Sequence, residues 1–243
     1  MKISAKTDIG SVRKQNQDSY AAGELPGGIS WAVLCDGMGG AAAGAVASTM
    51  AVRMISEKIS SSCSEQMTEN FIRNILVSVI ESANAYLYDV SRSNPEYKGM
   101  GTTAVALIAM GDSVCISHVG DSRAYKITPS GDIKQITRDH SVVQQLVERG
   151  DITPEQAKTH PERHIITRAV GVDEKVSVDF CRESLDEGDI ILLCSDGLSG
   201  YVDDKDIAAA TANGDYCQFA DRLVNMAIEN GGGDNITVVL ISK

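Results

Sequence analysis

The stretch Trp31–Gly40, WAVLCDGMGG, decides the fold of this chain. Its apolar run, Trp31–Cys35, is rich in residues that suit a pleated, buried surface and predicts a strand that stops at Asp36. The glycines that follow predict a sharp turn into a helix. A second apolar run, Ile190–Cys194, leads in the same way to Asp196 and a glycine. The sequence therefore predicts two acidic residues, from opposite ends of the chain, that each stand at the end of a buried strand.

Length and composition favour one globular domain. The chain has 243 residues, of which 43% are hydrophobic, and no Pro- or Ser-rich linker divides it, so we expect a single domain over residues 1–243. The formal net charge of −11, without a cluster of Lys or Arg, argues against a nucleic-acid or anionic membrane partner. The segment MKISAKTDIG has no apolar leader character, and no apolar run reaches the length that spans a bilayer. We therefore expect a cytoplasmic protein, and a monomer.

Strands and helices fall in separate blocks of the sequence. Apolar and alternating segments predict strands at 2–8, 31–35, 102–109, 113–119, 123–127, 133–136, 176–182, 190–194 and 236–242. Apolar residues at helical spacing predict long helices at 41–59 and 68–92, and shorter ones at 204–212 and 216–229. Because the helices come in pairs instead of alternating with strands, the pattern predicts an α+β sandwich rather than a parallel α/β sheet. The strands between residues 102 and 136 are expected to form an antiparallel meander.

The segment 138–168 differs in composition from its surroundings. It is charged and polar and contains only two short predicted helices, at 142–148 and 154–158. Long connections of this kind run over the surface and often border a functional site. We expect it to form a flap.

The glycines of GMGG, residues 37–40, could also cradle a phosphate at the start of a helix. That interpretation is disfavoured because no Gly-Lys-Ser/Thr follows, the G-x-G-x-x-G spacing is imperfect, and no βαβ unit surrounds the motif.

Four aspartates share one kind of setting. Asp36, Asp121, Asp196 and Asp234 each lie beside a glycine or at a turn. Carboxylates and main-chain carbonyls are hard oxygen ligands, which suit Mg²⁺ or Mn²⁺ better than zinc. Arg13 could then hold phosphate oxygens with its planar guanidinium. The alternative is that each aspartate is an ordinary turn residue, and the sequence alone does not bring the four together.

Eight sequence blocks, taken in order, carry a family resemblance. They are D-x-G-x-x-R-x-x-N-Q-D at 8–18, VLCDGMGG at 33–40, GMGTT at 99–103, HVGDSR at 118–123, TRDHS at 137–141, ITRAVG at 166–171, CSDGL at 194–198 and DNIT at 234–237. In order and spacing they resemble the metal-dependent type 2C protein phosphatase family (PPM) in its compact bacterial form. The resemblance covers nearly the whole chain.

The resemblance implies a fold, a reaction and a set of roles. The fold would be a four-layer αββα sandwich, in which helix pairs flank two antiparallel sheets and a surface flap borders the site. The reaction would be hydrolysis of phosphoserine and phosphothreonine in proteins by a water activated between two Mn²⁺ or Mg²⁺ ions. By this resemblance, Asp36 would bridge both ions and the carbonyl of Gly37 would be a ligand of one of them, which would explain a glycine there. Asp196 and Asp234 would bind the other ion, and Asp121, with Asp196, would provide a third metal position. Asp18 would support the metal waters, and Arg13 would bind the substrate phosphate.

Two positions depart from the family pattern. Gln17 stands where the family often has Glu, which removes one negative charge near the metal waters. Met38 stands where animal relatives have a His, and a thioether cannot protonate the leaving alkoxide. Our hypothesis for the proton donor is a metal-bound water, with His160 or His164 of the flap as less favoured alternatives.

Three classes of function follow. The first is a phosphoprotein phosphatase that opposes a bacterial serine/threonine kinase. The second is a catalytically silent phosphoprotein-binding module, which would be expected to have lost metal ligands. The third is a metal-dependent hydrolase of small phosphate esters.

Overall fold

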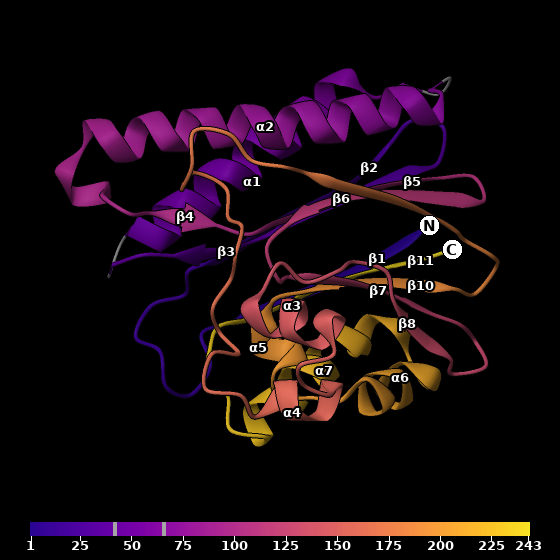
Figure 1. Ribbon diagram of the computed structural model, residues 1–243. Coiled ribbons are helices and arrows are strands. Elements are labelled where there is room, and N and C mark those ends of the chain that lie inside the picture. The colour runs from indigo at the N-terminus through magenta and orange to yellow at the C-terminus, as the bar shows by residue number, and fades with distance from the viewer. Residues whose placement is uncertain (41–42, 65–66) are drawn as a thin grey trace.

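Two antiparallel sheets lie face to face, and each has helices on its outer face (Figure 1). The computed structural model describes residues 1–40, 43–64 and 67–243. The first sheet has the order β1 (Lys2–Asp8), β11 (Ile236–Ser242), β10 (Ile190–Cys194), β7 (Arg123–Ile127) and β8 (Ile133–Gln135). The second has the order β2 (Asp18–Leu25), β3 (Ile29–Met38), β5 (Ala104–Met110), β6 (Ser113–Val119) and β9 (Asp179–Ser184), and β4 (Gly101–Thr102) pairs with the end of β3.

Two helix groups cover these sheets. The long helices α1 (Ala43–Ser62) and α2 (Glu69–Ser93) pack on the second sheet, and α5 (Asp196–Ser199), α6 (Asp204–Ala212) and α7 (Phe219–Glu229) lie on the side of the first (Figure 1). Helix α2 begins after Thr68 because the Thr68 hydroxyl accepts the N–H of Phe71 (3.3 Å). Short 3₁₀ turns lie at Pro95–Tyr97 (η1) and Tyr216–Gln218 (η2). Among the helices that the structure describes, none has the length and apolar character to cross a membrane.

Three hydrophobic cores fill the three interfaces between these four layers. One lies between the long helices and the second sheet, with Ile55 and Leu76. One lies between the sheets, with Leu34 and Leu193, and one lies under the C-terminal helices, with Leu223. Each such side chain contributes roughly 1.5–3 kcal/mol by leaving water. This arrangement confirms the four-layer αββα class.

The flap starts and ends at the same place on the sheets. Residues 138–168 contain α3 (Val142–Arg149) and α4 (Pro154–Lys158), close to the predicted limits. Ser141 accepts the N–H of Gln144 (3.2 Å) to start α3, and Gly150 ends it with a left-handed backbone. A bridge between Ser141 and Ile166 closes the base of the excursion.

Three expectations from the sequence need correction, and one strand was missed. The meander is wrong, because β5 and β6 pair in the second sheet whereas β7 and β8 pair in the first. Strand β2 was not predicted, since its side chains lack clear alternation. The strand expected at 176–182 is β9, at Asp179–Ser184. The strand expected at 31–35 extends over Ile29–Met38. The predicted helix start at residue 41 lies outside the described residues.

Candidate active site

Asp36 and Asp18 face each other on neighbouring strands. In the antiparallel register of β2 and β3, Asp18 is the direct partner of Asp36, so both carboxylates leave the sheet on the same side. The Asp36 N–H donates to Thr103 Oγ1 (2.9 Å), and its carbonyl accepts the Thr103 N–H (2.8 Å) and the Thr102 hydroxyl (2.8 Å). The sequence had suggested that Asp36 follows the end of the strand. Because β3 continues to Met38, Asp36 instead lies within it.

Both Asp-Gly corners are places of close backbone contact. A Cβ on Gly37 would lie 2.1 Å from the Gly44 carbonyl oxygen and 2.6 Å from that of Gln17. A Cβ on Gly197 would lie 1.9 Å from the Asn235 carbonyl oxygen. Packing therefore requires both glycines, a reason separate from the carbonyl ligand implied at Gly37. Each contact also places a second aspartate near the corner. Asp18 directly follows Gln17, which contacts Gly37, and Asp234 directly precedes Asn235, which contacts Gly197.

Asn235 ties the N-terminal loop to the C-terminal strand. Its Oδ1 accepts the Gln17 N–H (2.8 Å), and its Nδ2 donates to the carbonyls of Ile9 (2.9 Å) and Gln15 (3.1 Å). The loop that carries Arg13 is thereby held beside β11. Sequence reasoning placed Asn235 in a motif but gave it no role. Its position directly after the predicted metal ligand Asp234 was the sequence feature that could have indicated a role at the site.

Asp18 is held by two hydroxyl groups from the other sheet. Its Oδ2 accepts hydrogen bonds from Ser195 Oγ (2.7 Å) and Thr237 Oγ1 (2.7 Å). Its Oδ1 is buried and has no hydrogen-bond partner. Sequence reasoning missed the roles of Ser195 and Thr237, which only the packing of the two sheets makes visible.

Asp121 stands on the connection between the two sheets. The turn after β6 carries Asp121 and leads into β7 of the other sheet. The hydroxyl of Ser122 bonds that of Thr103 (2.7 Å), which also accepts the Asp36 N–H. The turn is therefore coupled by hydrogen bonds to the strand that carries Asp36.

The structure brings all five predicted aspartates together, and their negative charges act on one another. Burial and the carboxylates of Asp18 and Asp196 raise the pKa of Asp36 well above its ordinary value. Burial also raises the pKa of Asp18 to about 7, against the hydrogen bonds from its two hydroxyl partners. Burial and the charge of Asp196 raise the pKa of Asp121 to about 8. Burial and the charge of Asp234 raise the pKa of Asp196. The cluster is therefore unfavourable in its fully ionised form.

A divalent cation fits this cluster. Asp18 Oδ1 and Asp196 Oδ1 are both buried without a hydrogen-bond partner, and buried polar atoms normally have one. A hard cation would satisfy such oxygens and reverse the repulsion between the carboxylates. The donors are all oxygens, which agrees with Mg²⁺ or Mn²⁺ chemistry.

An arginine and a histidine border the aspartates. Arg13 NH2 lies 2.6 Å from Asp234 Oδ2, and half of the Arg13 side chain is exposed. From the flap, His164 Nδ1 lies 4.0 Å from Asp196 Oδ2. His160 instead accepts the N–H of Glu162 within the flap (3.1 Å). Of His160 and His164, it is His164 that lies next to an aspartate of the cluster.

The two departures from the family pattern have distinct surroundings. Gln17 uses its main chain: its carbonyl accepts the Gly37 N–H (3.1 Å) and the Ser48 hydroxyl (2.5 Å). Its side-chain amide lies against Gly44 of α1. Met38 is half-buried and pairs with Gly101 of β4. Neither residue supplies an acidic proton.

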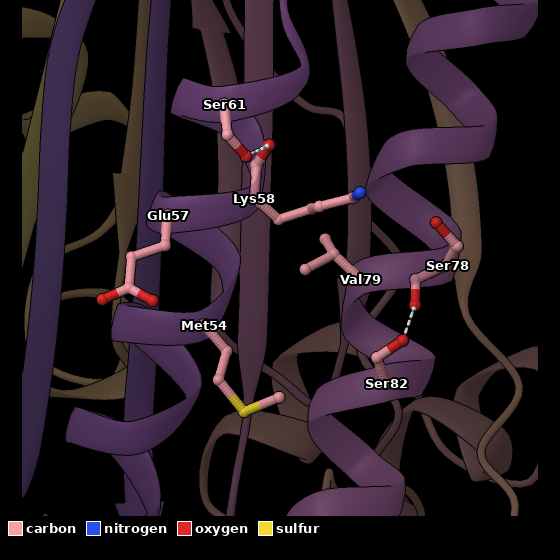
Figure 2. A pocket seen from close by; sticks show the side chains of 7 residues that line it. All are labelled: Met54, Glu57, Lys58, Ser61, Ser78, Val79 and Ser82. Carbon is pink, nitrogen blue, oxygen red and sulfur yellow. Dashed lines mark hydrogen bonds between the residues drawn. The ribbon is translucent and has the colours of Figure 1, made fainter.

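Two surface hollows lie near the long helices. One, of about 370 Å³, lies between α1 and α2 and is lined by residues such as Glu57, Lys58 and Ser82 (Figure 2). It contains none of the five aspartates. The other, of about 480 Å³, lies between α1 and the edge of β2, and Asp18 is part of its lining.

Comparison with known proteins identifies the family. The family model of protein phosphatase 2C matches residues 11–237. The serine/threonine protein phosphatase PstP of Mycobacterium tuberculosis is 36% identical over 240 residues, which are 99% of this chain and 44% of that protein. The chain thus spans less than half the length of that curated relative.

Solved structures show the same fold. The serine/threonine phosphatase of S. agalactiae superposes with a TM-score of 0.92 at 36% identity, covering 98% of both chains. The catalytic domain of PstP, in complex with two manganese ions, superposes with a TM-score of 0.85 at 34% identity, covering 98% of this chain and 96% of that one. The resemblance drawn from the eight sequence blocks is confirmed: this chain belongs to the protein phosphatase 2C family.

Proposed function

We propose that this protein is a metal-dependent phosphatase that hydrolyses phosphoserine and phosphothreonine in proteins. The observation that carries the proposal is the group of five carboxylates, with two buried oxygens that lack hydrogen-bond partners, beside an exposed arginine. The curated relative is named a serine/threonine protein phosphatase, and a solved relative holds two manganese ions. Both facts support the proposal. The substrates would be proteins phosphorylated by a bacterial serine/threonine kinase.

The cluster divides into metal ligands and supporting groups. Asp36 would be shared by two Mn²⁺ or Mg²⁺ ions, with the Gly37 carbonyl on one and Asp196 and Asp234 on the other. Asp121, with Asp196, would provide a third position. When bound, the ions would activate water as the nucleophile and offset the charge of the phosphoryl group.

The remaining steps belong to this chain's own residues. Asp18, fixed by its two hydroxyl partners, would orient water through its Oδ1. The bond from Arg13 to Asp234 uses one terminal nitrogen, and the guanidinium carries further donors for the substrate phosphate. The two Asp-Gly corners pack closely against main chain, which would hold Asp36 near Asp18 and Asp196 near Asp234.

One assay separates this function from its alternatives. We expect the wild-type protein with Mn²⁺ to release phosphate from a phosphothreonine peptide, and to lose that activity with a chelator. A silent phosphoprotein-binding module would bind the peptide without turnover. A hydrolase of small phosphate esters would act on nucleotides in preference to the peptide. Either result contradicts the proposal.

Replacing Arg13 tests the phosphate-binding role. We expect Arg13→Ala to lower kcat/KM for the peptide about 100-fold, because loss of a pair of charge-assisted hydrogen bonds costs about 3 kcal/mol. Arg13→Lys should recover part of the loss, since it keeps the charge without the planar fork. Arg53→Ala is the matched control, because Arg53 pairs with Glu57 on the exposed face of α1. Unchanged steady-state constants in Arg13→Ala would remove this role.

The flap histidines can be compared directly. Because His164 lies beside Asp196 whereas His160 bonds within the flap, we expect His164→Gln to lower kcat about 100-fold, the lower end of general acid catalysis, and to weaken the requirement for an acidic form. His160→Gln serves as the control from the same flap. If the pH profile of His164→Gln matches that of the wild type, the proton comes from water, as the sequence had suggested.

A further inference from the structure

Two buried histidines and an aspartate meet at the base of the flap. His118 lies in β6, His140 lies near the start of the flap, and Asp179 lies in β9 as the register partner of His118. One ligand atom of each lies within 4.8 Å of the others. The two rings are stacked, with centroids 4.8 Å apart and planes 15° apart.

This group is not shaped for a metal ion. A nitrogen lone pair lies in the plane of its imidazole ring, so two nearly parallel, stacked rings direct their lone pairs side by side and not at one point. Arg168 NH1 also lies 2.7 Å from Asp179 Oδ1 and 3.2 Å from His140 Nε2, so a cation already faces the carboxylate. The arrangement needs a different explanation.

His140 holds both main-chain polar groups of Gly120. The His140 N–H donates to the Gly120 carbonyl (3.0 Å), and the Gly120 N–H donates to His140 Nδ1 (3.1 Å). Gly120 directly precedes Asp121. One buried residue thus fixes the direction in which the chain enters the turn that carries Asp121.

The other ring nitrogen keeps His140 in the required tautomer. Because Nδ1 accepts a hydrogen bond, the ring proton belongs on Nε2, which faces Asp179 Oδ2 at 3.3 Å. Burial and the neighbouring His118 lower the pKa of His140 to about 4, so the ring is neutral and Nδ1 is available as an acceptor. Asp179 therefore supports the bond to Gly120 from the far side of the ring.

The same group joins both ends of the flap. His118 Nε2 donates to the Arg138 carbonyl (2.9 Å), and the Thr167 N–H donates to the His140 carbonyl (2.7 Å). The segment that leaves the sheet at 138 and the one that returns at 168 therefore both contact the histidine pair. The flap base and the Asp121 turn share one set of hydrogen bonds.

We propose that His140 is a positioning residue for Asp121, acting through the two hydrogen bonds to Gly120. The inference rests on the proposed role of Asp121 in a third metal position. The side chain of His140 does not touch substrate or metal in this scheme. Its effect is to keep the Asp121 carboxylate aimed at the cluster.

Two polar variants of His140 provide a matched pair. In His140→Asn the amide oxygen can occupy the place of Nδ1 and accept the Gly120 N–H, whereas the longer side chain of His140→Gln places its oxygen nearer the position of Nε2. The first measurement is hydrogen exchange of the Gly120 amide. The second is calorimetric titration of the metal-free protein with Mn²⁺. Asp121→Asn is titrated in parallel to identify the site that depends on Asp121.

We expect His140→Gln to exchange the Gly120 amide at least tenfold faster. It should also weaken the Asp121-dependent Mn²⁺ site about 10- to 100-fold, as loss of supporting hydrogen bonds does at metal sites, while the other sites change less than about threefold. His140→Asn should behave as the wild type in both measurements. His118→Phe, which keeps a stacked ring, should leave the Gly120 amide protected.

The outcomes distinguish the positioning role of His140 from the metal role of Asp121. Wild-type exchange and titration in His140→Gln, or equal weakening of every Mn²⁺ site, overturns the positioning role. If His140→Gln does not fold, loss of Gly120 protection in His140→Asn overturns it, and retained protection supports it. If Asp121→Asn changes no Mn²⁺ site, the metal role of Asp121 fails, and the Gly120 exchange rates still decide whether His140 fixes the turn.

Discussion

Replacing Asp36 with asparagine is expected to have opposite effects on activity and on stability. Phosphate release from the phosphothreonine peptide should fall about 10³-fold in kcat, because the proposed shared ligand of two ions is lost and metal ions supply several kcal/mol of charge stabilisation. The metal-free variant should nevertheless unfold at a higher temperature than the metal-free wild type. Its neutral amide replaces a carboxyl group whose own pKa is raised well above the ordinary value by burial and by the charges of Asp18 and Asp196.

The stability difference should depend on pH in a defined direction. A carboxyl whose pKa is raised on folding binds more protons in the folded than in the unfolded state, so stability falls as pH rises through that interval. Unfolded aspartate titrates near 3.9, and in the folded protein burial and the charges of Asp18 and Asp196 hold the pKa of Asp36 well above that value. Because the variant lacks the Asp36 titration, its advantage in melting temperature should be small at about pH 4 and should grow as pH rises. For a chain of this size, each kcal/mol corresponds to about 2–4 °C.

A matched control is available on the surface. Asp89 lies exposed on α2, so Asp89→Asn should change neither activity nor the pH dependence of the melting temperature. Differential scanning calorimetry with chelator and with Mn²⁺ measures both effects. If metal-free Asp36→Asn is less stable than the wild type at pH 8, the carboxylates do not repel each other as the structure indicates.

Replacing Gly197 with alanine should disrupt the site through the backbone. The added Cβ would lie 1.9 Å from the Asn235 carbonyl oxygen, and no side-chain rotation relieves a contact with main chain. Overpacking of this kind costs about 1–3 kcal/mol or more, so we expect the melting temperature to fall by about 5–10 °C. The corner that carries Asp196 and the turn that carries Asp234 should move apart. Mn²⁺ affinity should therefore fall at least tenfold.

Gly40 provides the comparison for this variant. A Cβ at Gly40 would meet no atom within 4 Å, so Gly40→Ala should melt close to the wild type and keep its Mn²⁺ affinity. Isothermal titration and thermal unfolding measure the two predictions. A Gly197→Ala protein with wild-type melting temperature and Mn²⁺ affinity would show that this backbone contact does not hold the site together.

Local patterns predicted most of the elements but not their partners. The strands at Lys2–Asp8, Ser113–Val119 and Ile190–Cys194 match their predicted limits, because each is a short apolar or alternating segment bounded by turn residues. The turn at Gly120–Ser122 reads like a hairpin, yet it passes from one sheet to the other. Which sheet a strand joins depends on contacts with β9 and β10, which lie far along the chain.

Strand β2 shows the limit of periodicity. It is an edge strand whose residues are mostly half-buried, so its hydrophobic pattern is weak. Its place is set by the register of Asp18 against Asp36. A strand whose position depends on one long-range pairing is hard to predict from its own residues.

The sequence by itself determined the donors: five aspartates, an arginine and the two Asp-Gly corners, in blocks that identify the family. It determined the alternation of strand and helix blocks as well, because these depend on local periodicity. Only the tertiary structure decided that Asp18 and Asp234 meet the Asp-Gly corners, through backbone contacts at Gly37 and Gly197 that no side-chain pattern records. The tertiary structure also decided that the Gly120 N–H donates a hydrogen bond to His140 Nδ1. The physical reason is that such contacts join residues far apart in sequence, and their geometry exists only once both sheets have packed.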